Sequence, residues 1–596
     1  MPTVLHRLAK WAEVAPNAVA QTYKKDGRRV SITAKEFMDR VYHLALFLES
    51  RGLSPKDSGC IFAYNSPEWV HMDLATLLVG ARSAGIYPNS VAKDIQYILN
   101  HTESRVLGVQ NKEYFQRITD ESGNVALPKS VELVIVFDND ASVSRQAVGY
   151  KTAIAEGAKL AQAKGESGLK QFLDRIKPTE GAFMIYTSGT TGNPKGALLS
   201  HDNLVYTSDL ASRYWSLPLG RGSMFSFLPL CHIAEKLQNV GVGISQRYAV
   251  NFATKFENVA AELPEVQPTL LLCVPRLWEK MMEGVLDKVA KGKGAKKVLA
   301  TWALGVGARV ADAKYSGRAP GLVDKLALPV ADKLVLSKIR QALGLGKAEL
   351  LASGAAALPA HVAKWFRSLG LEILEDFGQT ESTGVICMTE PGVDSLGTVG
   401  KAVPGVEFKL AADGEILTRG RHVFVGYFKD EASTRATLEG GWLHTGDLGE
   451  LNEKGQVRIR GRKKEILKTS GGKMIAPLPI EEALKAAPMI SQVCVVGDGR
   501  KFVSALITLS ESTLNDLKGR NGALSGKVVD LPEVVKRVRD HIDELNGKLA
   551  SYEQIKKFAV LSKEFSIVDG EMTPTLKMKR NVIETRYRDV IDQLYA

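Results

Sequence analysis

The chain has 596 residues, of which 45% are hydrophobic and 24% charged, and its formal net charge is +12. This length predicts more than one structural unit, and the composition excludes disordered and fibrous classes. No run of eighteen apolar residues occurs, which argues against a membrane-spanning helix. The first residues lack the apolar stretch and cleavage site of a secretory signal. Val4, Leu5, Leu8 and Trp11 instead predict a short amphipathic helix packed on the body.

Five cysteines are scattered along the chain, and none forms a Cys-x-x-Cys pair. We therefore expect buried free thiols in a reducing cytosol rather than disulfides or a zinc site. The expected location is cytoplasmic, with peripheral contact at the inner membrane face left open. The cysteines are Cys60, Cys231, Cys273, Cys387 and Cys494.

Short apolar runs alternate with helical patterns through most of the first 460 residues. One of the helical patterns, 359–370, has proline near its start and glycine at its end. Buried strands that alternate with helices predict an α/β fold built on largely parallel sheets. The predicted strands include 60–64, 132–137, 182–188, 269–275 and 371–376.

Three segments depart from this alternation. Residues 138–180 are polar and predict a surface excursion. Residues 280–348 predict helices added to one side of the fold, and they contain fourteen Lys or Arg against five Asp or Glu, a net charge of +9. That charge suits a solvated face, anionic lipid or nucleic acid. From about 461 the chain enters a smaller α+β unit, so we expect an N-terminal domain over 1–461 and a mobile C-terminal domain over 462–596.

The densest chemical signal is the stretch from Tyr186 to His201, in which an apolar strand runs into a loop rich in glycine and hydroxyl side chains. Glycine lets backbone N–H groups turn towards an anion, and Lys195 adds a point charge. A flexible surface turn is the alternative, but the density of donors favours phosphate binding. It is not a Walker A loop, because no Gly-Lys pair in the chain is followed by Ser or Thr.

Together with five further motifs in the same order, this loop resembles the adenylate-forming enzymes, which include acyl-CoA synthetases, luciferases and peptide-synthetase adenylation domains. The tail motif and the basic insertion resemble long-chain fatty acyl-CoA synthetases most. The resemblance covers nearly the whole chain. The further motifs are LPLCHIAEK (228–236), LLASGAAAL (350–358), EDFGQTES (375–382), the stretch 440–473 and GEMTPTLKMKR (570–580).

The resemblance implies a set of nucleotide contacts. Small residues at the end of one strand and the EDFGQ backbone would frame adenine, Thr380 would meet the α-phosphate, and Asp447 with Arg462 would hold the ribose. Taken alone, the small residues suit close helix–strand packing equally well, and Asp447 suits a tight turn. The implied nucleotide-binding residues are Thr187, Ser188, Gly189, Thr190, Thr191, Gly192, Lys195, Gly354, Ala355, Ala356, Asp376, Phe377, Gly378, Gln379, Thr380, Asp447, Arg462 and Lys468.

The same resemblance implies the catalytic and moving parts. Thr187 and Glu381 would hold Mg²⁺, which prefers few carboxylates plus phosphate oxygens. His232 would lie beside the acyl carboxylate, although a core histidine is the plainer interpretation of that residue alone. Lys577 would bridge the carboxylate and the α-phosphate, with Lys579 as the competing register. Lys464 would be the hinge, and Gly471 with Gly472 would line a coenzyme A tunnel.

These implications predict an AMP-forming ligase that uses ATP, Mg²⁺ and coenzyme A. A fatty acid would become an acyl-adenylate with release of pyrophosphate, and then a thioester. The alternatives are a fatty-acyl-AMP ligase that loads a carrier protein, and a non-catalytic binding protein of the same fold. We expect small-molecule partners, no nucleic acid, and membrane-surface contact through 280–348.

Overall fold

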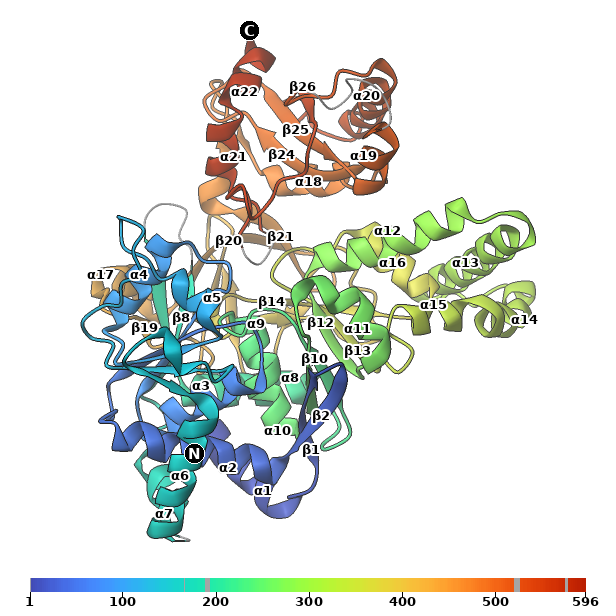
Figure 1. The fold of residues 1–596 in the computed structure, drawn as a ribbon. Helices are drawn as coiled ribbons and strands as arrows, with labels where there is room; N and C mark the ends of the chain where they lie inside the picture. Colours follow the sequence, from blue (N-terminus) through green and yellow to red (C-terminus); the bar gives the residue numbers. More distant parts are fainter. Residues whose placement is uncertain (1, 166, 188–192, 519–525, 574–576) are drawn as a thin grey trace.

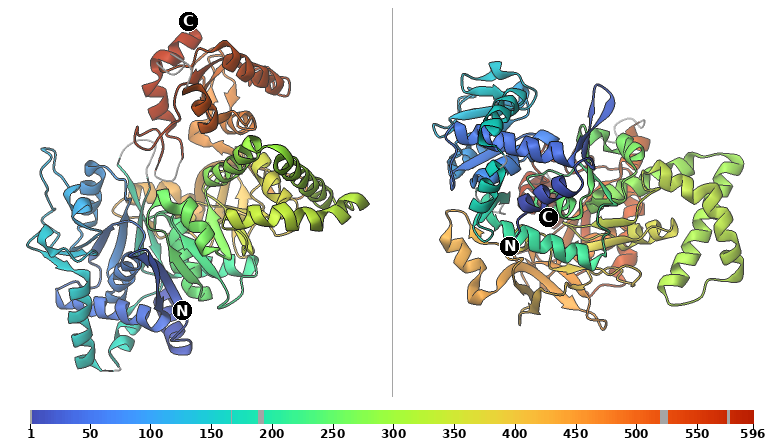
Figure 2. Two further views of the ribbon diagram at one scale, coloured as in Figure 1. Left: turned by 45° about the vertical axis from the view of Figure 1, so that its right-hand side comes forward. Right: turned by 90° about the horizontal axis from the view of Figure 1, so that it is seen from below.

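The computed structural model describes residues 2–165, 167–187, 193–518, 526–573 and 577–596. A large lobe carries most of the chain, and a smaller lobe formed by the C-terminal residues stands above it (Figure 1). The left view of Figure 2 shows the same separation of the two lobes. The predicted α/β class, with a large lobe of mainly parallel sheets and a smaller C-terminal domain, is confirmed.

Two large sheets form the body of the large lobe, and the strands at the centre of each are parallel. The five strands predicted from apolar runs all belong to these sheets. The first sheet has the order β19 (Gly426–Tyr427), β9 (Lys195–Ser200), β8 (Gly181–Thr187), β4 (Arg82–Ile86), β3 (Ser58–Phe62), β5 (Val106–Val109), β6 (Leu133–Val136) and β7 (Ala147–Gly149). The second has the order β16 (Lys401–Ala402), β15 (Cys387–Met388), β14 (Ile373–Phe377), β13 (Leu350–Ser353), β12 (Leu270–Cys273), β10 (Ser223–Ser226), β11 (Ala249–Phe252), β1 (Val19–Lys25) and β2 (Arg28–Thr33).

Helices cover these sheets and a third, antiparallel sheet completes the large lobe. The third sheet consists of β17 (Glu407–Leu410), β18 (Glu415–Arg419), β20 (Leu443–Leu451) and β21 (Val457–Arg462). The covering helices are α1 (Val4–Val14), α2 (Ala34–Ser50), α3 (Pro67–Val79), α4 (Ala92–Thr102), α5 (Lys112–Gln116), α6 (Tyr150–Lys164), α7 (Ser167–Arg175), α8 (His201–Tyr214), α9 (Ile233–Lys236), α10 (Ile244–Gln246), α11 (Val259–Val266), α16 (Ala360–Ser368) and α17 (Glu431–Thr437).

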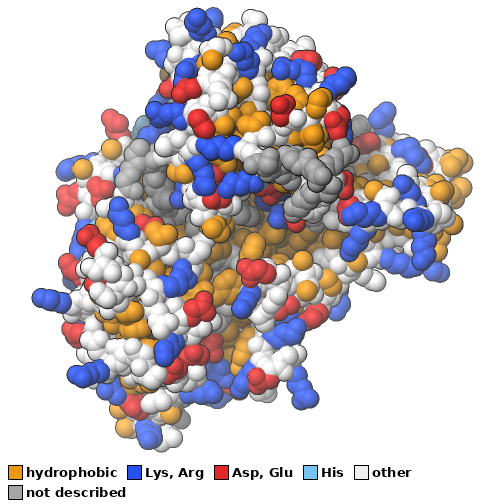
Figure 3. All heavy atoms as spheres, turned by 45° about the horizontal axis from the view of Figure 1, so that its top comes forward, with side chains coloured by type: hydrophobic (Ala, Val, Ile, Leu, Met, Phe, Trp, Pro, Cys, Tyr) orange, Lys and Arg blue, Asp and Glu red, His pale blue; other side chains and the backbone are white. Residues whose placement is uncertain are grey.

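The basic segment forms a helical extension at one side of the large lobe (Figure 1). Its helices are α12 (Pro275–Lys291), α13 (Gly294–Tyr315), α14 (Leu322–Ala331) and α15 (Ser337–Ala342), with a short π-helical stretch Asp332–Leu336 before the last. Hydrophobic and basic side chains lie side by side on the outer end of this extension (Figure 3). None of the helices in the described part of the chain is both long enough and apolar enough to cross a membrane.

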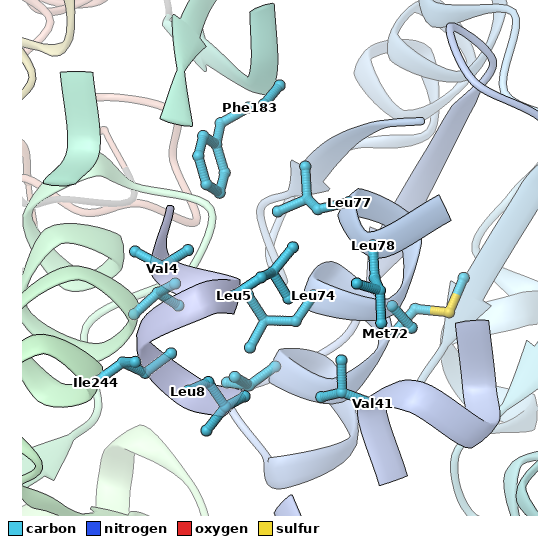
Figure 4. Packing of buried hydrophobic residues seen from close by; sticks show 14 of the residues in the cluster. Val4, Leu5, Leu8, Val41, Met72, Leu74, Leu77, Leu78, Phe183 and Ile244 are labelled. Carbon is cyan, nitrogen blue, oxygen red and sulfur yellow. The ribbon is translucent and has the colours of Figure 1, made fainter. Parts of the chain in front are cut away.

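The predicted amphipathic helix at the start of the chain is confirmed. Val4, Leu5 and Leu8 of α1 are fully buried, as is Trp11. They pack against leucines of α3, and they lie close to Phe183 of β8 (Figure 4). This helix therefore contributes to the same apolar core as the central helices that cover the first sheet.

Two other expectations have clear outcomes. The five cysteines are free and buried, as predicted. Residues 138–180 are more than a surface excursion, because Ala147–Gly149 adds an edge strand to the first sheet and α6 packs on α2. The apolar signal in that segment is short, with Tyr150, Ala153 and Gly157 as the buried residues of α6. A polar stretch with so few buried positions has too weak a periodicity to reveal a packed helix.

The smaller lobe begins after β21 ends at Arg462, and Lys463–Glu465 forms one 3₁₀ turn between the lobes. Its sheet has β25 at the centre, antiparallel to β24 and parallel to β26. The elements are β22 (Leu467–Lys468), β23 (Met474–Ile475), α18 (Pro477–Leu484), β24 (Ile490–Val496), β25 (Val503–Leu509), α19 (Glu511–Lys518), α20 (Pro532–Asn546), β26 (Ile555–Leu561), α21 (Arg580–Arg586) and α22 (Arg588–Tyr595).

Candidate active site

The predicted phosphate loop joins two neighbouring antiparallel strands. Thr187 is the last residue of β8, Lys195 is the first of β9, and the two are cross-strand partners. The Thr187 hydroxyl donates to the Lys195 carbonyl at 3.5 Å. Ser188, Gly189, Thr190, Thr191 and Gly192, which were predicted as phosphate donors, lie outside the described residues. The strands therefore place Thr187 and Lys195 at the two ends of the loop.

The ammonium of Lys195 lies over a small polar cluster that sequence reasoning missed. Its Nζ is 2.5 Å from the Ser433 hydroxyl and 3.8 Å from a carboxylate oxygen of Asp430, and it lies 5.1 Å from the ring centre of Tyr427. The side chain remains about half exposed. A partly hydrated lysine with weak partners is free to turn towards a phosphate.

Glu381 lies in a buried 3₁₀ turn, Thr380–Ser382, which follows the end of β14 at Phe377. The Tyr427 hydroxyl donates to its Oε1 at 2.6 Å, which fixes the orientation of the carboxylate. Burial and the adjacent Glu381 raise the pKa of Tyr427, so the phenol stays protonated and remains a donor. Thr380 beside it is also buried. One oriented carboxylate together with the Thr187 hydroxyl is a donor set of the kind that Mg²⁺ accepts when phosphate oxygens complete it.

The expected adenine-binding residues meet where β13 and β14 end. A Cβ atom added at Gly354 would lie 2.6 Å from the Asp376 carboxylate, so only glycine fits there. Ala355 adopts a φ of 70°, a left-handed conformation that is costly for a residue with a side chain. Burial raises the pKa of Asp376 to about 7, and its buried Oδ1 has no hydrogen-bond partner among the described residues. An unpartnered buried acceptor beside a strained turn marks a place where a ligand donor would complete the hydrogen bonding.

The remaining members of this group follow in sequence around the same turn. Ala356 continues the loop after Ala355, and Phe377 is the last residue of β14. Gly378 packs so closely on the Gly384 carbonyl that a Cβ atom would lie 2.3 Å from it. Gln379 precedes the Thr380 turn and its backbone N–H donates to the Ser382 hydroxyl at 3.0 Å.

Asp447 and Arg462 face each other across the antiparallel pair β20–β21. Arg462 Nε lies 2.8 Å from Asp447 Oδ1, and the aspartate is buried while the arginine is about half exposed. Burial raises the pKa of Asp447, and the positive charges of Arg462 and Lys577 act in the opposite direction. The two residues predicted to share the ribose therefore already form an ion pair.

Lys577 reaches this site from the smaller lobe. Its neighbours include Arg462, which together with loss of solvation lowers the pKa of the ammonium, and Asp447 and Glu381, which raise it. Within the described residues the structure records no carboxylate at ion-pairing distance from Lys577, and the residue as a whole keeps an exposed surface. The lysine thus faces the interlobe space with charged groups around it and no fixed partner. Lys579 instead directly precedes α21 as its N-cap residue, and its backbone N–H donates to the Glu571 carbonyl at 2.7 Å.

His232 is one of the residues that line a small, mainly apolar pocket of the large lobe. Burial lowers the pKa of His232 to about 3, and the charge of Lys577 acts in the same direction. The imidazole is therefore neutral, and its Nδ1 accepts from the Ala234 backbone N–H at 3.2 Å. The lining residues are Leu228, Pro229, His232, Ala234, Leu272, Cys273, Val274, Gly354 and Ala355.

The predicted hinge and tunnel residues lie apart from this cluster, and so does Lys468, which was predicted to bind the nucleotide. Lys464 is in the 3₁₀ turn that follows β21, at the passage between the lobes. Lys468 is in β22 and its backbone N–H donates to Asp498 at 2.9 Å. Gly471 and Gly472 form the turn of the β22–β23 hairpin, where Gly472 has a φ of 78° and open space around it. In this orientation of the lobes, Lys468 and the hairpin glycines belong to the surface of the smaller lobe.

Sequence comparisons place the chain in a family. The AMP-binding enzyme model matches residues 8–428, and the model of the AMP-binding enzyme C-terminal domain matches residues 464–596. The chain belongs to the AMP-binding enzyme family. It is 34% identical over 577 residues to the long-chain-fatty-acid–CoA ligase FadD15 of Mycobacterium bovis, covering 96% of this chain and 93% of that protein. It is 31% identical to the long-chain-fatty-acid–CoA ligase ACSBG2 of Xenopus laevis, covering 100% of this chain and 84% of the relative.

Solved structures of this family share the fold. The anthranilate CoA ligase AuaEII, in complex with anthranoyl-AMP, aligns over 99% of this chain and 98% of its own with a TM-score of 0.74 and 19% identity. The adenylation domain of a carboxylate reductase from Mycobacterium chelonae aligns over 100% of this chain and 91% of its own with a TM-score of 0.73 and 19% identity. At this identity the likeness concerns the two-lobed architecture, and the ligands belong to those proteins.

Proposed function

We propose that this AMP-binding enzyme activates a long-chain fatty acid with ATP, forms an acyl-adenylate, and transfers the acyl group to coenzyme A. Full-length similarity to relatives named long-chain-fatty-acid–CoA ligases supports the acid and the acceptor. The observation that carries the proposal is the meeting of Lys577 from the smaller lobe with Asp447, Glu381 and His232 of the larger one, beside an apolar cavity. An acid with a long apolar tail and a nucleotide would meet at that point.

The first step joins two anions. A carboxylate oxygen of the acid attacks the α-phosphorus of ATP, the bond from that phosphorus to the bridging oxygen breaks, and pyrophosphate leaves. Charge repulsion opposes this approach, so fixed positive charge and positioning supply most of the catalysis. Lys577 would bridge the reacting carboxylate and the α-phosphate, and Lys195 would neutralise the leaving pyrophosphate. Neutral His232 adds no competing positive or negative charge beside the carboxylate.

The expected magnesium site consists of Glu381 and Thr187. Their donor chemistry fits the ion, because one carboxylate held by Tyr427 and one hydroxyl leave most of the coordination to phosphate oxygens and water. When bound, Mg²⁺ would withdraw charge from the phosphates. The protein's part is to orient Glu381 and to hold Lys195 at the other end of the loop.

The second step exchanges AMP for a thiolate. The sulfur of coenzyme A attacks the acyl carbon, and the mixed anhydride releases AMP. Lys577 would no longer be needed, and we propose that the smaller lobe turns about Lys464 so that the hairpin with Gly471 and Gly472 comes to the site. The glycines would let the cofactor pass close to the backbone.

The decisive experiment is ATP–pyrophosphate exchange with the purified protein over acids from two to eighteen carbons, followed by detection of the thioester with coenzyme A. We expect exchange that strengthens with chain length, because each buried methylene contributes about 0.8 kcal/mol. Exchange without thioester formation would favour a ligase that loads a carrier protein. No exchange with any acid would leave a non-catalytic binding protein.

We also propose that the helical extension binds an anionic membrane surface. Leu322, Leu326 and Val330 follow one another at four-residue spacing on α14 and are 73%, 69% and 50% exposed. This stripe is apolar and faces water, and Lys325 and Lys333, close to it in the sequence, are exposed as well. An apolar helix face flanked by lysines suits the boundary between headgroups and acyl chains of a bilayer that carries negative charge.

Sedimentation with vesicles tests this surface. We expect stronger binding to vesicles of phosphatidylcholine with phosphatidylglycerol than to phosphatidylcholine alone, and about a tenfold or greater loss for Lys325→Gln/Lys333→Gln. Leu326→Glu should weaken binding further, whereas the control Val568→Glu, at a fully exposed residue of the smaller lobe, should not. Equal binding to both vesicles, a dimer abolished by Leu326→Glu, or salt-dependent DNA binding instead of vesicle binding would overturn the membrane assignment.

A further inference from the structure

A buried ionic contact joins the two lobes at the start of α12. Arg276 belongs to the large lobe, and its side chain is only 11% exposed. One of its terminal nitrogens crosses to the smaller lobe, where it lies 2.7 Å from Glu564 and 2.8 Å from the Ser491 hydroxyl. Its other terminal nitrogen bonds Glu279 of its own helix at 3.0 Å. Arg276 therefore binds both lobes at once.

A second cation makes the reciprocal contact. Lys485 follows α18 in the smaller lobe, and its Nζ lies 3.2 Å from Glu279 of the large lobe and 3.2 Å from Glu482 of its own lobe. Glu279 thus lies between Arg276 and Lys485 and is almost completely buried. Each lobe contributes one cation that reaches a carboxylate of the other. We call Arg276, Glu279, Lys485 and Glu564 the interlobe clasp.

The clasp depends on its two cations because carboxylates are in excess around it. Glu283 and Glu482 also face the contact, with Lys280 and His361 at its border. Burial raises the pKa of Glu283 and Glu482, and the negative charge of Glu279 adds to the rise in both. Removing either cation would leave like charges opposed across a poorly hydrated interface, which disfavours contact.

The clasp is rigidly connected to Lys577. Arg580, three residues beyond Lys577, bonds Glu481 of α18 at 2.7 Å and the Val495 carbonyl of β24 at 2.6 Å. Lys485 directly follows the last residue of α18, and Ser491 belongs to β24. The segment that carries Lys577 and the parts of the smaller lobe that enter the clasp therefore move as one body.

We propose that Arg276 and Lys485 are positioning residues that hold the smaller lobe in the orientation in which Lys577 faces the adenylation site. The inference rests on the proposed function, since it concerns the first of the two steps. None of the four clasp residues is a predicted nucleotide-binding or catalytic residue or lines the apolar pocket, so the effect of the clasp reaches the reaction through Lys577. The thioester step, which does not require Lys577, does not require the clasp.

Separate measurement of the half-reactions tests this assignment. Arg276→Ala and Lys485→Ala should each lower acyl-AMP formation in single turnover by about tenfold or more, because the docked orientation becomes a minor population. Thioester formation from supplied dodecanoyl-AMP and coenzyme A should stay within about twofold of wild type. Arg276→Lys should recover part of the loss, and the control Arg309→Ala, which breaks an ion pair with Asp324 at 2.7 Å on the extension, should change neither step. Equal loss in both steps, or no loss in the first, would overturn the proposal.

A readout without catalysis separates this inference from the proposed function. Spin labels at Val91→Cys and Val568→Cys, one exposed residue on each lobe, report the distance between the lobes. Arg276→Ala should broaden the distance distribution, and adding Glu564→Ala should narrow it again in part, because it removes one of the carboxylates left opposed across the interface. An unchanged distribution would refute the clasp even if the enzyme is active. A broadened distribution in a protein that forms no acyl-adenylate would support the clasp and contradict the proposed adenylation.

Discussion

A comparison of Lys236 and Lys577 shows how the groups around an ammonium decide its role in this molecule. Lys236 lies inside the large lobe, where its ammonium is 2.7 and 2.8 Å from the two carboxylate oxygens of Asp73 and lies over the rings of Trp69 and Phe183. Lys577 lies between the lobes among Arg462, Asp447 and Glu381, and no described carboxylate is close enough to pair with it. The Lys236 ammonium therefore has its carboxylate partner within the chain, whereas the Lys577 ammonium has none among the described residues.

The difference separates a structural charge from a functional one. A buried lysine whose donors are all engaged stabilises one arrangement of the chain, and removing it leaves a buried carboxylate. A lysine held in a cleft without a partner retains its capacity to bind an incoming anion. The comparison predicts that substitutions at Lys236 act on folding and that substitutions at Lys577 act on one chemical step.

The largest effect is expected for the free energy of unfolding when Lys236 is replaced. Lys236→Met should lower the free energy of unfolding by about 3–5 kcal/mol, because it would leave Asp73 buried without its cation, with the Ser83 hydroxyl as a remaining donor. Denaturant unfolding followed by fluorescence measures the change. Adding Asp73→Leu should restore much of the stability, since an apolar pair replaces the ionic one. A loss of less than about 1 kcal/mol for Lys236→Met would show that the pair contributes little.

Replacement of Lys577 should instead lower the rate of the adenylation step. Lys577→Ala should slow acyl-AMP formation by about 10²–10³-fold, as the removal of a preorganised donor does elsewhere, with unchanged stability. Thioester formation from supplied acyl-AMP should survive. Lys579→Ala is the matched control, because this lysine lies two residues away and is the N-cap residue of α21. A larger loss for Lys579→Ala would show that the register is wrong.

A smaller effect is expected where a neutral group orients a charged one. Tyr427→Phe removes the hydroxyl that donates to Glu381 at 2.6 Å, a bond worth about 1.5–3 kcal/mol when one partner is charged. The Mg²⁺ concentration for half-maximal adenylation should rise about tenfold or more, and saturating Mg²⁺ should recover most of the rate. Tyr206→Phe, which loses a bond to the Gly405 carbonyl at 2.8 Å, should leave the Mg²⁺ requirement unchanged. A rate loss that Mg²⁺ does not recover would argue against an orienting role.

The sequence was sufficient for the framework because the relevant signals are local. Apolar runs such as 132–137 and 182–188 are long enough to identify buried strands without any knowledge of their neighbours. Asp447 and Arg462 lie in the same predicted motif, 440–473, and the structure pairs them across β20 and β21.

What the sequence left hidden depends on contacts between distant residues. Lys236 and Asp73 are separated by 163 residues, so nothing in the IAEK string distinguishes a buried cation from a solvated one. Tyr427, Asp430 and Ser433 follow the predicted phosphate loop by more than two hundred residues and have no pattern of their own. Arg276 directly follows the predicted strand 269–275, but its partner Glu564 is 288 residues away.

The smallest effect is a displacement of the pH profile of adenylation, and the charged neighbours of Lys577 should displace it in opposite directions. Loss of solvation and the charge of Arg462 lower the pKa of Lys577, so kcat/KM for adenylation should fall on the alkaline side below the ordinary lysine pKa of about 10.4. Asp447→Asn removes a charge that raises this pKa, which should move the decline to lower pH, and Arg462→Gln should move it to higher pH. Lys577→Arg should abolish the decline, because arginine does not titrate in this range. The free enzyme's profile measures the shift even where these changes lower the rate, and a decline that stays fixed in all three variants would assign it to another group.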